Sequence, residues 1–139
     1  LFDGASLAGR AAQTLVCSLY FGYKHRTPDP WAYTSSRYEQ GKYARTLDLV
    51  TAGGRDGRGA YGRALEIGCS EGVFTALLAG RGVARELVAV DISRAALRRA
   101  RERCRAFPHV RFERRNAFHA PPAGPFDLVL CAEVLYYAG

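Results

Sequence analysis

The stretch Leu65-Glu-Ile-Gly-Cys-Ser-Glu-Gly72 decides the fold of this chain. Arg63–Ile67 is predicted to form a strand, Gly68–Gly72 a tight loop, and Val73–Ala79 the helix that follows. Glycine tolerates positive φ angles and carries no side chain, so a ligand can approach the backbone of such a turn near the start of the helix. The stretch therefore predicts a nucleotide-type binding turn between a buried strand and a helix.

The same unit of strand and helix repeats on the C-terminal side of the turn. Leu87–Val90 is predicted as a buried strand, and Ser93 as the N-cap of a helix over Ala95–Cys104. Val110–Glu113 and Phe126–Leu130 are predicted as further strands. Strands separated by helices pair in parallel through right-handed crossovers. The expected fold is α/β, a Rossmann-like, doubly wound and mostly parallel sheet, present as an N-terminal portion of about four strands.

Two helices are expected before the turn. Apolar residues fit a helix from Ala5 to Tyr20 only loosely, and Arg26–Pro30 interrupts the pattern. Tyr38–Ala52 has apolar residues at helical spacing and ends before a pair of glycines. We therefore expect residues 1–55 to form an N-terminal helical lid or cap segment. Residues 56–139 would form the ligand-binding domain, incomplete at its C-terminal end.

Composition excludes several classes of protein. Apolar residues make up 48% of the chain and charged residues 24%, which is typical of ordinary globular domains. No apolar run is long enough to span a bilayer, so a cytoplasmic protein without a membrane partner is expected. The net charge of +7 comes mostly from scattered arginines, and nucleic-acid binding is not indicated. The four cysteines lack metal-ligand spacing, so free thiols and no metal site are expected.

A second acidic residue follows the next predicted strand. Asp91 stands 23 positions after Gly68, where a carboxylate can accept hydrogen bonds from ribose hydroxyls. Alternatively, Asp91 only precedes or caps the following helix. Its register with the glycine turn favours the interpretation that it binds the ribose. The dinucleotide pattern G-x-G-x-x-G is not met, because Ser70 stands where the middle glycine belongs. This departure disfavours an NAD-dependent reductase.

Several segments together resemble the class I S-adenosylmethionine-dependent methyltransferases, and within them the N-methyltransferases of the nodulation protein S type. Glu66–Thr75 is similar to their first motif, and Val88–Asp91 to their second strand with its ribose acid. Ala132–Tyr137 looks like their segment after the fourth strand, and Asp29–Trp31 followed by Tyr38-Glu39 resembles their N-terminal lid. The resemblance implies an enzyme whose cofactor is S-adenosyl-L-methionine.

The resemblance also implies which residues bind the methionine end of this cofactor. Gly68, Cys69 and Gly72 would line the methionine and ribose end of the site. Glu66 would help to hold the amino-acid part through water or backbone contacts. These assignments come from the family and not from the spacing of the residues.

The adenosine end is implied in the same way. Asp91 would bind the ribose, and Ile92 would lie against the adenine. After the third strand the family usually has an acid near the adenine amino group, whereas this chain has Asn116, followed by Ala117 and Phe118. An asparagine oxygen can still accept a hydrogen bond from that amine, so we expect Asn116 to take the role without the charge.

Methyl transfer from a sulfonium is an in-line displacement, so catalysis depends chiefly on aligning the nucleophile, the methyl group and sulfur. Just beyond the fourth strand, the family places residues that face both the sulfonium and the acceptor. Glu133 stands there and is therefore the first polar candidate. Glu133 or Tyr136 can orient an amine, and Glu133 can accept its proton. His119 or His25 can also serve if either faces the cleft; otherwise each is a solvated loop residue.

Three aromatic residues of the N-terminal segment complete the expected site. Trp31, Tyr33 and Tyr38 are expected to close over the cofactor or a sugar, since aromatic faces attract cations. Alternatively, they pack against the N-terminal helix.

The function expected from this resemblance is N-methylation of a small-molecule acceptor, such as a sugar amine or a natural-product precursor. O-methylation of a small molecule is the nearest rival. A non-catalytic cofactor-binding or partner-binding fragment is the rival from another class, because the familiar architecture continues with strands beyond the fourth. A nucleic-acid methyltransferase is a further alternative, although no Asn-Pro-Pro-Tyr type motif follows the fourth strand.

Overall fold

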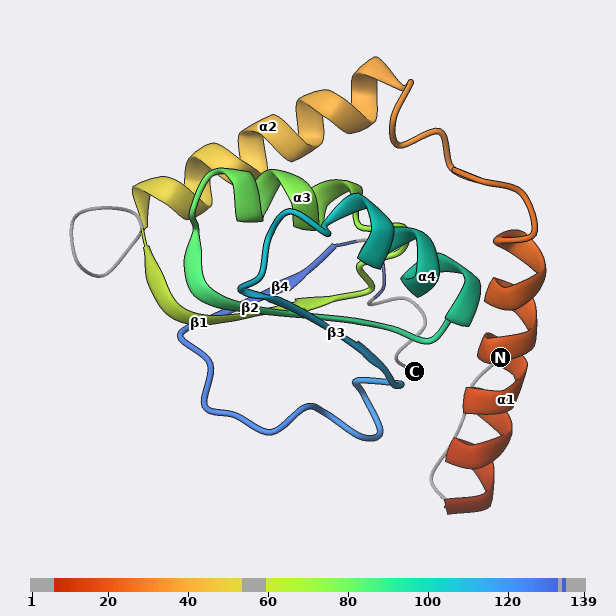
Figure 1. The fold of residues 1–139 in the computed structure, drawn as a ribbon. Coiled ribbons are helices and arrows are strands. Elements are labelled where there is room, and N and C mark those ends of the chain that lie inside the picture. The colour runs from red at the N-terminus through yellow and green to blue at the C-terminus, as the bar shows by residue number, and fades with distance from the viewer. Residues whose placement is uncertain (1–6, 54–59, 133, 135–139) are drawn as a thin grey trace.

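The computed structural model describes residues 7–53, 60–132 and 134 (Figure 1). Four strands form one sheet in the order β3-β2-β1-β4, and every neighbouring pair is parallel. The strands are β1 (Tyr61–Ile67), β2 (Ala84–Asp91), β3 (Val110–Arg114) and β4 (Leu128–Cys131). This topology confirms the expected Rossmann-like α/β class.

Three helices cover one face of the sheet, and a further helix stands at its end. They are α1 (Leu7–Lys24), α2 (Arg37–Ala52), α3 (Val73–Gly80) and α4 (Arg94–Arg103). Figure 1 shows α2, α3 and α4 on the same side of the strands, with α1 standing at the end of the sheet beside α4. The connection from β3 to β4 passes the other face without a helix, as its prolines predict, and packs Ala117 and Phe126 against that face. The carboxyl ends of the strands point toward α1 (Figure 1).

The alternation of side chains along the central strands divides the core into two layers. Ala64 and Leu87 belong to the cluster that α2 and α3 cover, whereas Leu65 and Val88 belong to the cluster on the opposite face. The ring of Phe74 in α3 stacks on Tyr43 in α2 with centroids 4.8 Å apart. This packing places α2, and the segment that leads into it, over the start of α3.

Side-chain caps fix the starts of two helices. Ser93 accepts a hydrogen bond from the Ala96 amide at 3.3 Å, which confirms the predicted N-cap of α4. Ser36 caps α2 by accepting from the Glu39 amide at 3.4 Å. The cap of α4 matters for the site, because Ser93 lies two residues after Asp91 and its own amide bonds that acid.

Several predicted boundaries differ from the structure, and β2 begins three residues before the predicted Leu87. The first helix continues past Tyr20 to Lys24, because Phe21 packs against Trp31 and helical hydrogen bonding continues to His25. The fourth strand begins at Leu128 rather than Phe126, since the Asp127 side chain accepts a hydrogen bond from the Arg63 amide at 2.9 Å where a strand would offer a backbone carbonyl. Among the described residues, no helix is both long and apolar enough to cross a membrane.

Candidate functional site

The glycine turn, Gly68–Gly72, has three left-handed residues within five positions. Gly68, Ser70 and Gly72 have φ angles of 77°, 50° and 74°. A Cβ on Gly68 would lie 2.3 Å from a methyl carbon of Val134, and one on Gly72 would lie 2.9 Å from the Cβ of Ala100 in α4. The glycines therefore let the turn pack closely against other parts of the protein, whereas the sequence suggested that they make room for a ligand.

Asp91 connects the end of β2 to this turn. Its Oδ2 accepts a hydrogen bond from the Ser70 amide at 2.9 Å, and its Oδ1 accepts from the Ser93 amide at 2.8 Å. Burial raises the pKa of Asp91, and these backbone hydrogen bonds act against that rise. A carboxylate offers about four acceptor positions, so Asp91 keeps capacity for a further donor. Asp91 thus both precedes the helix cap, as the alternative interpretation held, and faces the site.

Glu66 lies on the other side of the turn, under α3. Its side chain is buried, and its Oε2 accepts a hydrogen bond from the Thr75 hydroxyl at 2.6 Å. The pKa of Glu66 is raised to about 7. Burial is the largest cause, the hydrogen bond from Thr75 acts against it, and the nearby charge of Asp91 adds to the rise. A carboxyl with such a pKa changes its charge near neutral pH.

Among the described residues, three cavities meet at the turn, and Gly68 lines each of them. A largely apolar cavity of about 80 Å³ extends past Asp91 to Ile92 and Asn116. A cavity of about 170 Å³ lies between the turn and the N-terminal segment, and one of about 30 Å³ contains Glu66. The three spaces share the turn and lie at the carboxyl ends of the strands, which is where open α/β sheets bind ligands.

The residues expected at the adenine line the first cavity. Ile92, Asn116, Ala117 and Phe118 all contribute to its walls, and Phe118 is 37% exposed. The Asn116 oxygen accepts a hydrogen bond from the Phe118 amide at 3.2 Å. One lone pair of that oxygen remains for a ligand amine.

His119 lies behind this wall. Its Nδ1 is 3.1 Å from the Thr14 hydroxyl and 3.3 Å from the Asn116 amide nitrogen. The amide of Asn116 also donates to Thr14 at 3.1 Å. His119 lines none of the three cavities, so the structure does not bring it beside the space between the turn and the N-terminal segment.

The N-terminal segment supplies an aromatic wall, formed by Trp31 and Tyr33. Their rings stack with centroids 5.9 Å apart, and both line the cavity of about 170 Å³. Tyr33 also reaches the cavity that contains Glu66. Tyr38 is 71% exposed on α2 and lines neither cavity, so the structure does not bring it into the wall.

Several residues that line the site were not singled out from the sequence. Cys17 and Phe21 of α1 line the apolar cavity, and Glu39 lines the space beside the aromatic wall. His25, which the sequence offered as a candidate if it faces the cleft, does line that same space. The spacing of Cys17 and Phe21 is helical, but the loose apolar pattern of α1 gave no preferred face. Ser70 was interpreted only as a missing glycine, although its hydroxyl contacts His25 at 3.0 Å.

Two expected catalytic residues, Glu133 and Tyr136, lie outside the described residues. Within the described part of the chain, no group of three or more side chains is arranged to hold a metal ion.

Comparison with known proteins relates this geometry to a family. Residues 23–139 match the family model described as nodulation protein S (NodS). The chain belongs to the NodS family. It is 37% identical to nodulation protein S of Bradyrhizobium diazoefficiens over 109 residues, which cover 78% of this chain and 49% of that protein. It is 32% identical to the Rhizobium tropici protein over 111 residues, covering 80% and 44% respectively. The chain thus spans about half the length of these NodS relatives.

The fold comparison gives the same family. The crystal structure of the N-methyltransferase NodS from Bradyrhizobium japonicum WM9, in complex with S-adenosyl-L-homocysteine, matches with a TM-score of 0.76 and 29% identity. The match covers 87% of this chain and 58% of the NodS chain. The glycine turn and Asp91 lie within the residues that the family model matches.

Proposed function

We propose that the chain forms the S-adenosylmethionine-binding part of a cytoplasmic N-methyltransferase that acts on an amine of a sugar or another small molecule. The observation that carries the proposal is the set of cavities that share the glycine turn, two of which Asp91 also lines. These cavities occur in a chain whose fold matches a NodS crystallised with S-adenosyl-L-homocysteine. Because the chain spans about half of its relatives, the activity is proposed for the full-length protein.

The adenosine half of the cofactor fits the donors and acceptors of the first cavity. Asp91 keeps acceptor capacity beyond its bonds to the Ser70 and Ser93 amides, which suits the hydroxyls of a ribose. The apolar walls beyond it, including Ile92 and Phe118, suit a flat aromatic ring. The Asn116 oxygen is the acceptor for an exocyclic amine at the far end.

The methionine half fits the opposite end. Glu66 is a buried acid in the cavity that Tyr33 and Tyr43 also line. A carboxylate surrounded by aromatic rings favours a ligand with positive charge. When bound, S-adenosylmethionine supplies an electrophilic methyl group on a sulfonium, and the acid and rings of this chain orient that cationic end.

The acceptor would approach through the space beside the aromatic wall. We assign Glu133 and Tyr136 to orient the acceptor amine and, for Glu133, to accept its proton. We assign His119 to hold Asn116 in place, since its ring contacts that residue and Thr14. Residues 1–55 would act as the lid, and residues 56–139 as the cofactor-binding domain.

The first test is calorimetric titration of S-adenosyl-L-homocysteine into the full-length protein. Asp91→Ala should weaken binding by about 1–3 kcal/mol, which is typical when a hydrogen-bonded partner is left unsatisfied. Asp48→Ala is the matched control, because Asp48 is an exposed acid on α2 away from the cavities. A folded wild-type protein that does not bind this ligand would contradict the proposed function.

The second test separates N-methylation from O-methylation. A glucosamine-type acceptor and its N-acetylated counterpart carry the same remaining hydroxyls, but only the first has a free amine. Mass spectrometry should find a transferred methyl group on the amine and none on the acetylated sugar. Methylation of both acceptors would favour the O-methyltransferase alternative.

A further inference from the structure

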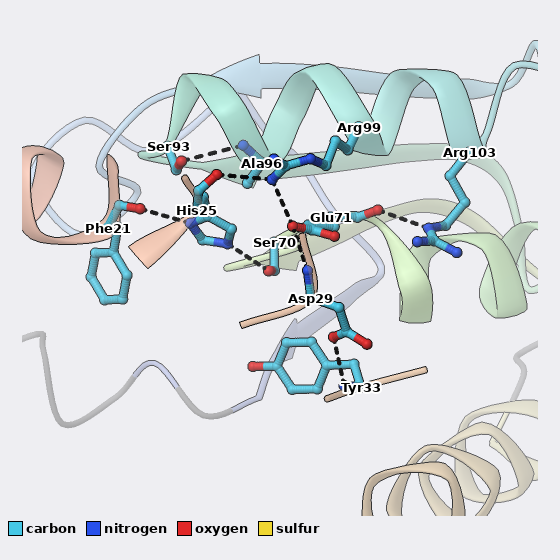
Figure 2. A network of polar contacts seen from close by, with 10 residues as sticks. All are labelled: Phe21, His25, Asp29, Tyr33, Ser70, Glu71, Ser93, Ala96, Arg99 and Arg103. Carbon is cyan, nitrogen blue, oxygen red and sulfur yellow. Dashed lines mark hydrogen bonds and ion pairs between the residues drawn. The ribbon is translucent and has the colours of Figure 1, made fainter. Parts of the chain in front are cut away.

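Two residues of the glycine turn hold the N-terminal segment that leads to the aromatic wall (Figure 2). The Ser70 hydroxyl lies 3.0 Å from Nε2 of His25, and Oε1 of Glu71 accepts a hydrogen bond from the Asp29 amide at 3.0 Å. Nδ1 of His25 lies 2.8 Å from the carbonyl oxygen of Phe21. Because a carbonyl can only accept, Nδ1 carries the hydrogen, and in the neutral ring Nε2 accepts from Ser70.

Arg99 of α4 bridges the same two segments. Its Nη1 donates to the carbonyl oxygen of His25 at 2.9 Å and to Oε1 of Glu71 at 2.8 Å. Glu71 is 2% exposed, so its charge is buried and paired with Arg99. Removing one partner of such a pair leaves an uncompensated buried charge, which proteins tolerate poorly. Figure 2 shows Arg99 between His25 and Glu71, with Asp29 on the far side of the acid.

The segment that is held in this way has a demanding backbone. Asp29 and Ala32 have left-handed φ angles of 49° and 56°, and neither is a glycine. Such conformations persist only when surrounding contacts determine them. Oδ1 of Asp29 accepts from the Tyr33 amide at 2.7 Å, so a contact at Asp29 is transmitted directly to the aromatic wall.

We propose that Ser70, Glu71, Arg99 and His25 form a clasp that holds the N-terminal segment closed over the turn. Glu71, Arg99 and His25 are then positioning residues: they set where Trp31 and Tyr33 stand relative to the bound cofactor. This assignment extends the proposed function and, for its binding consequence, rests on it. A ligand that binds only the closed segment is bound more weakly by the factor by which the closed population falls.

The clasp itself is tested without any ligand, by hydrogen–deuterium exchange of the full-length protein. Arg99→Gln should accelerate exchange at the Asp29 and Tyr33 amides by about tenfold or more, because their hydrogen bonds open when the segment is released. Arg98→Gln is the matched control, since Arg98 is the exposed neighbour on the same helix and the substitution removes the same charge. Equal exchange rates in the wild type and Arg99→Gln would overturn the clasp.

Its positioning role is tested by titration with S-adenosyl-L-homocysteine. We expect about tenfold weaker binding for Arg99→Gln, partial recovery for Arg99→Lys, and no change for Arg98→Gln. Faster exchange with unchanged affinity would overturn the positioning role. If the wild type does not bind S-adenosyl-L-homocysteine, both the proposed function and the positioning role fail. The exchange measurement still decides whether the clasp exists.

A third variant covers the case in which Arg99→Gln does not fold. Ser70→Ala removes only the hydroxyl that contacts His25. The hydrogen bond from the backbone amide of residue 70 to Asp91 can still form. It should accelerate exchange at the Asp29 and Tyr33 amides relative to the wild type, and a complete lack of change would overturn the clasp.

Discussion

The two sides of the site are held in different ways. On the turn side, residues 68–72 take left-handed angles mostly at glycines and pack closely against Ala100 and Val134. On the opposite side, residues 25–33 take left-handed angles without any glycine and are held by side chains from other elements. Local sequence thus determines the turn, while tertiary contacts determine the aromatic wall. Substitutions in the turn should act mainly on folding, and those in the wall mainly on binding.

The largest effect is expected for Gly72→Ala. The new methyl group would lie 2.9 Å from the Cβ and 3.0 Å from the Cα of Ala100, on a residue with φ of 74°. A left-handed alanine costs roughly 1–2 kcal/mol, and overpacking against a helix backbone adds roughly 1–3 kcal/mol. We expect a loss of about 4 kcal/mol in the free energy of unfolding, measured by urea denaturation.

Gly82→Ala is the control that separates the two costs. Gly82 has φ of 64°, but a Cβ there would meet no atom within 4 Å. Only the backbone cost of about 1–2 kcal/mol should remain. If Gly72→Ala is no more destabilising than Gly82→Ala, close packing against α4 does not fix the turn.

The second prediction concerns the pH dependence that Glu66 contributes. Its pKa in the folded protein is raised to about 7, above the ordinary value of 4.5, so the folded state binds the proton more tightly than the unfolded chain. The resulting stabilisation is fully present below about pH 4.5 and is lost as pH rises through about 7. At one unit of pKa per 1.36 kcal/mol, the loss is about 3 kcal/mol.

Glu66→Gln should abolish this loss. The difference in unfolding free energy between the variant and the wild type should shift in favour of the variant by about 3 kcal/mol between pH 4.5 and pH 8. Glu102→Gln, a substitution of the same kind at an exposed position of α4, should keep the wild-type profile. Parallel pH profiles for Glu66→Gln and the wild type would show that Glu66 does not titrate in this range.

The same contrast explains how much of the molecule the sequence could predict. Glycines, an N-cap serine and alternating apolar residues are local signals, and they located the turn, α4 and the central strands to within a few residues. The end of α1 was placed four residues early, because its continuation depends on the packing of Phe21 against Trp31. No pattern within one helix contains that contact.

The candidate site shows more clearly which features a local sequence pattern cannot predict. Asp91 could be proposed from its place at the end of the strand that follows the glycine turn, whereas Asn116 was implied only by the family resemblance; both line the first cavity. The contacts of Glu71 with Asp29 and Arg99 join positions 42 and 28 residues apart, so only the folded chain brings them together. Likewise, Tyr33 and Tyr38 are equally aromatic in the sequence, and only the structure distinguishes the residue in the cavities from the residue in solvent.

The smallest effect tests that distinction. If Tyr33 faces the cationic end of S-adenosylmethionine, Tyr33→Leu should weaken the binding of this ligand by about 1 kcal/mol, since an aromatic face attracts a cation and leucine does not. The neutral thioether of S-adenosyl-L-homocysteine should lose less affinity, so the ratio of the two dissociation constants reports the ring itself. Tyr38→Leu should change neither constant, because that ring is 71% exposed and lines neither cavity beside the wall. An equal loss for both ligands in Tyr33→Leu would indicate that Tyr33 only supports the packing of the wall, and the recognition of charge would then rest with Glu66.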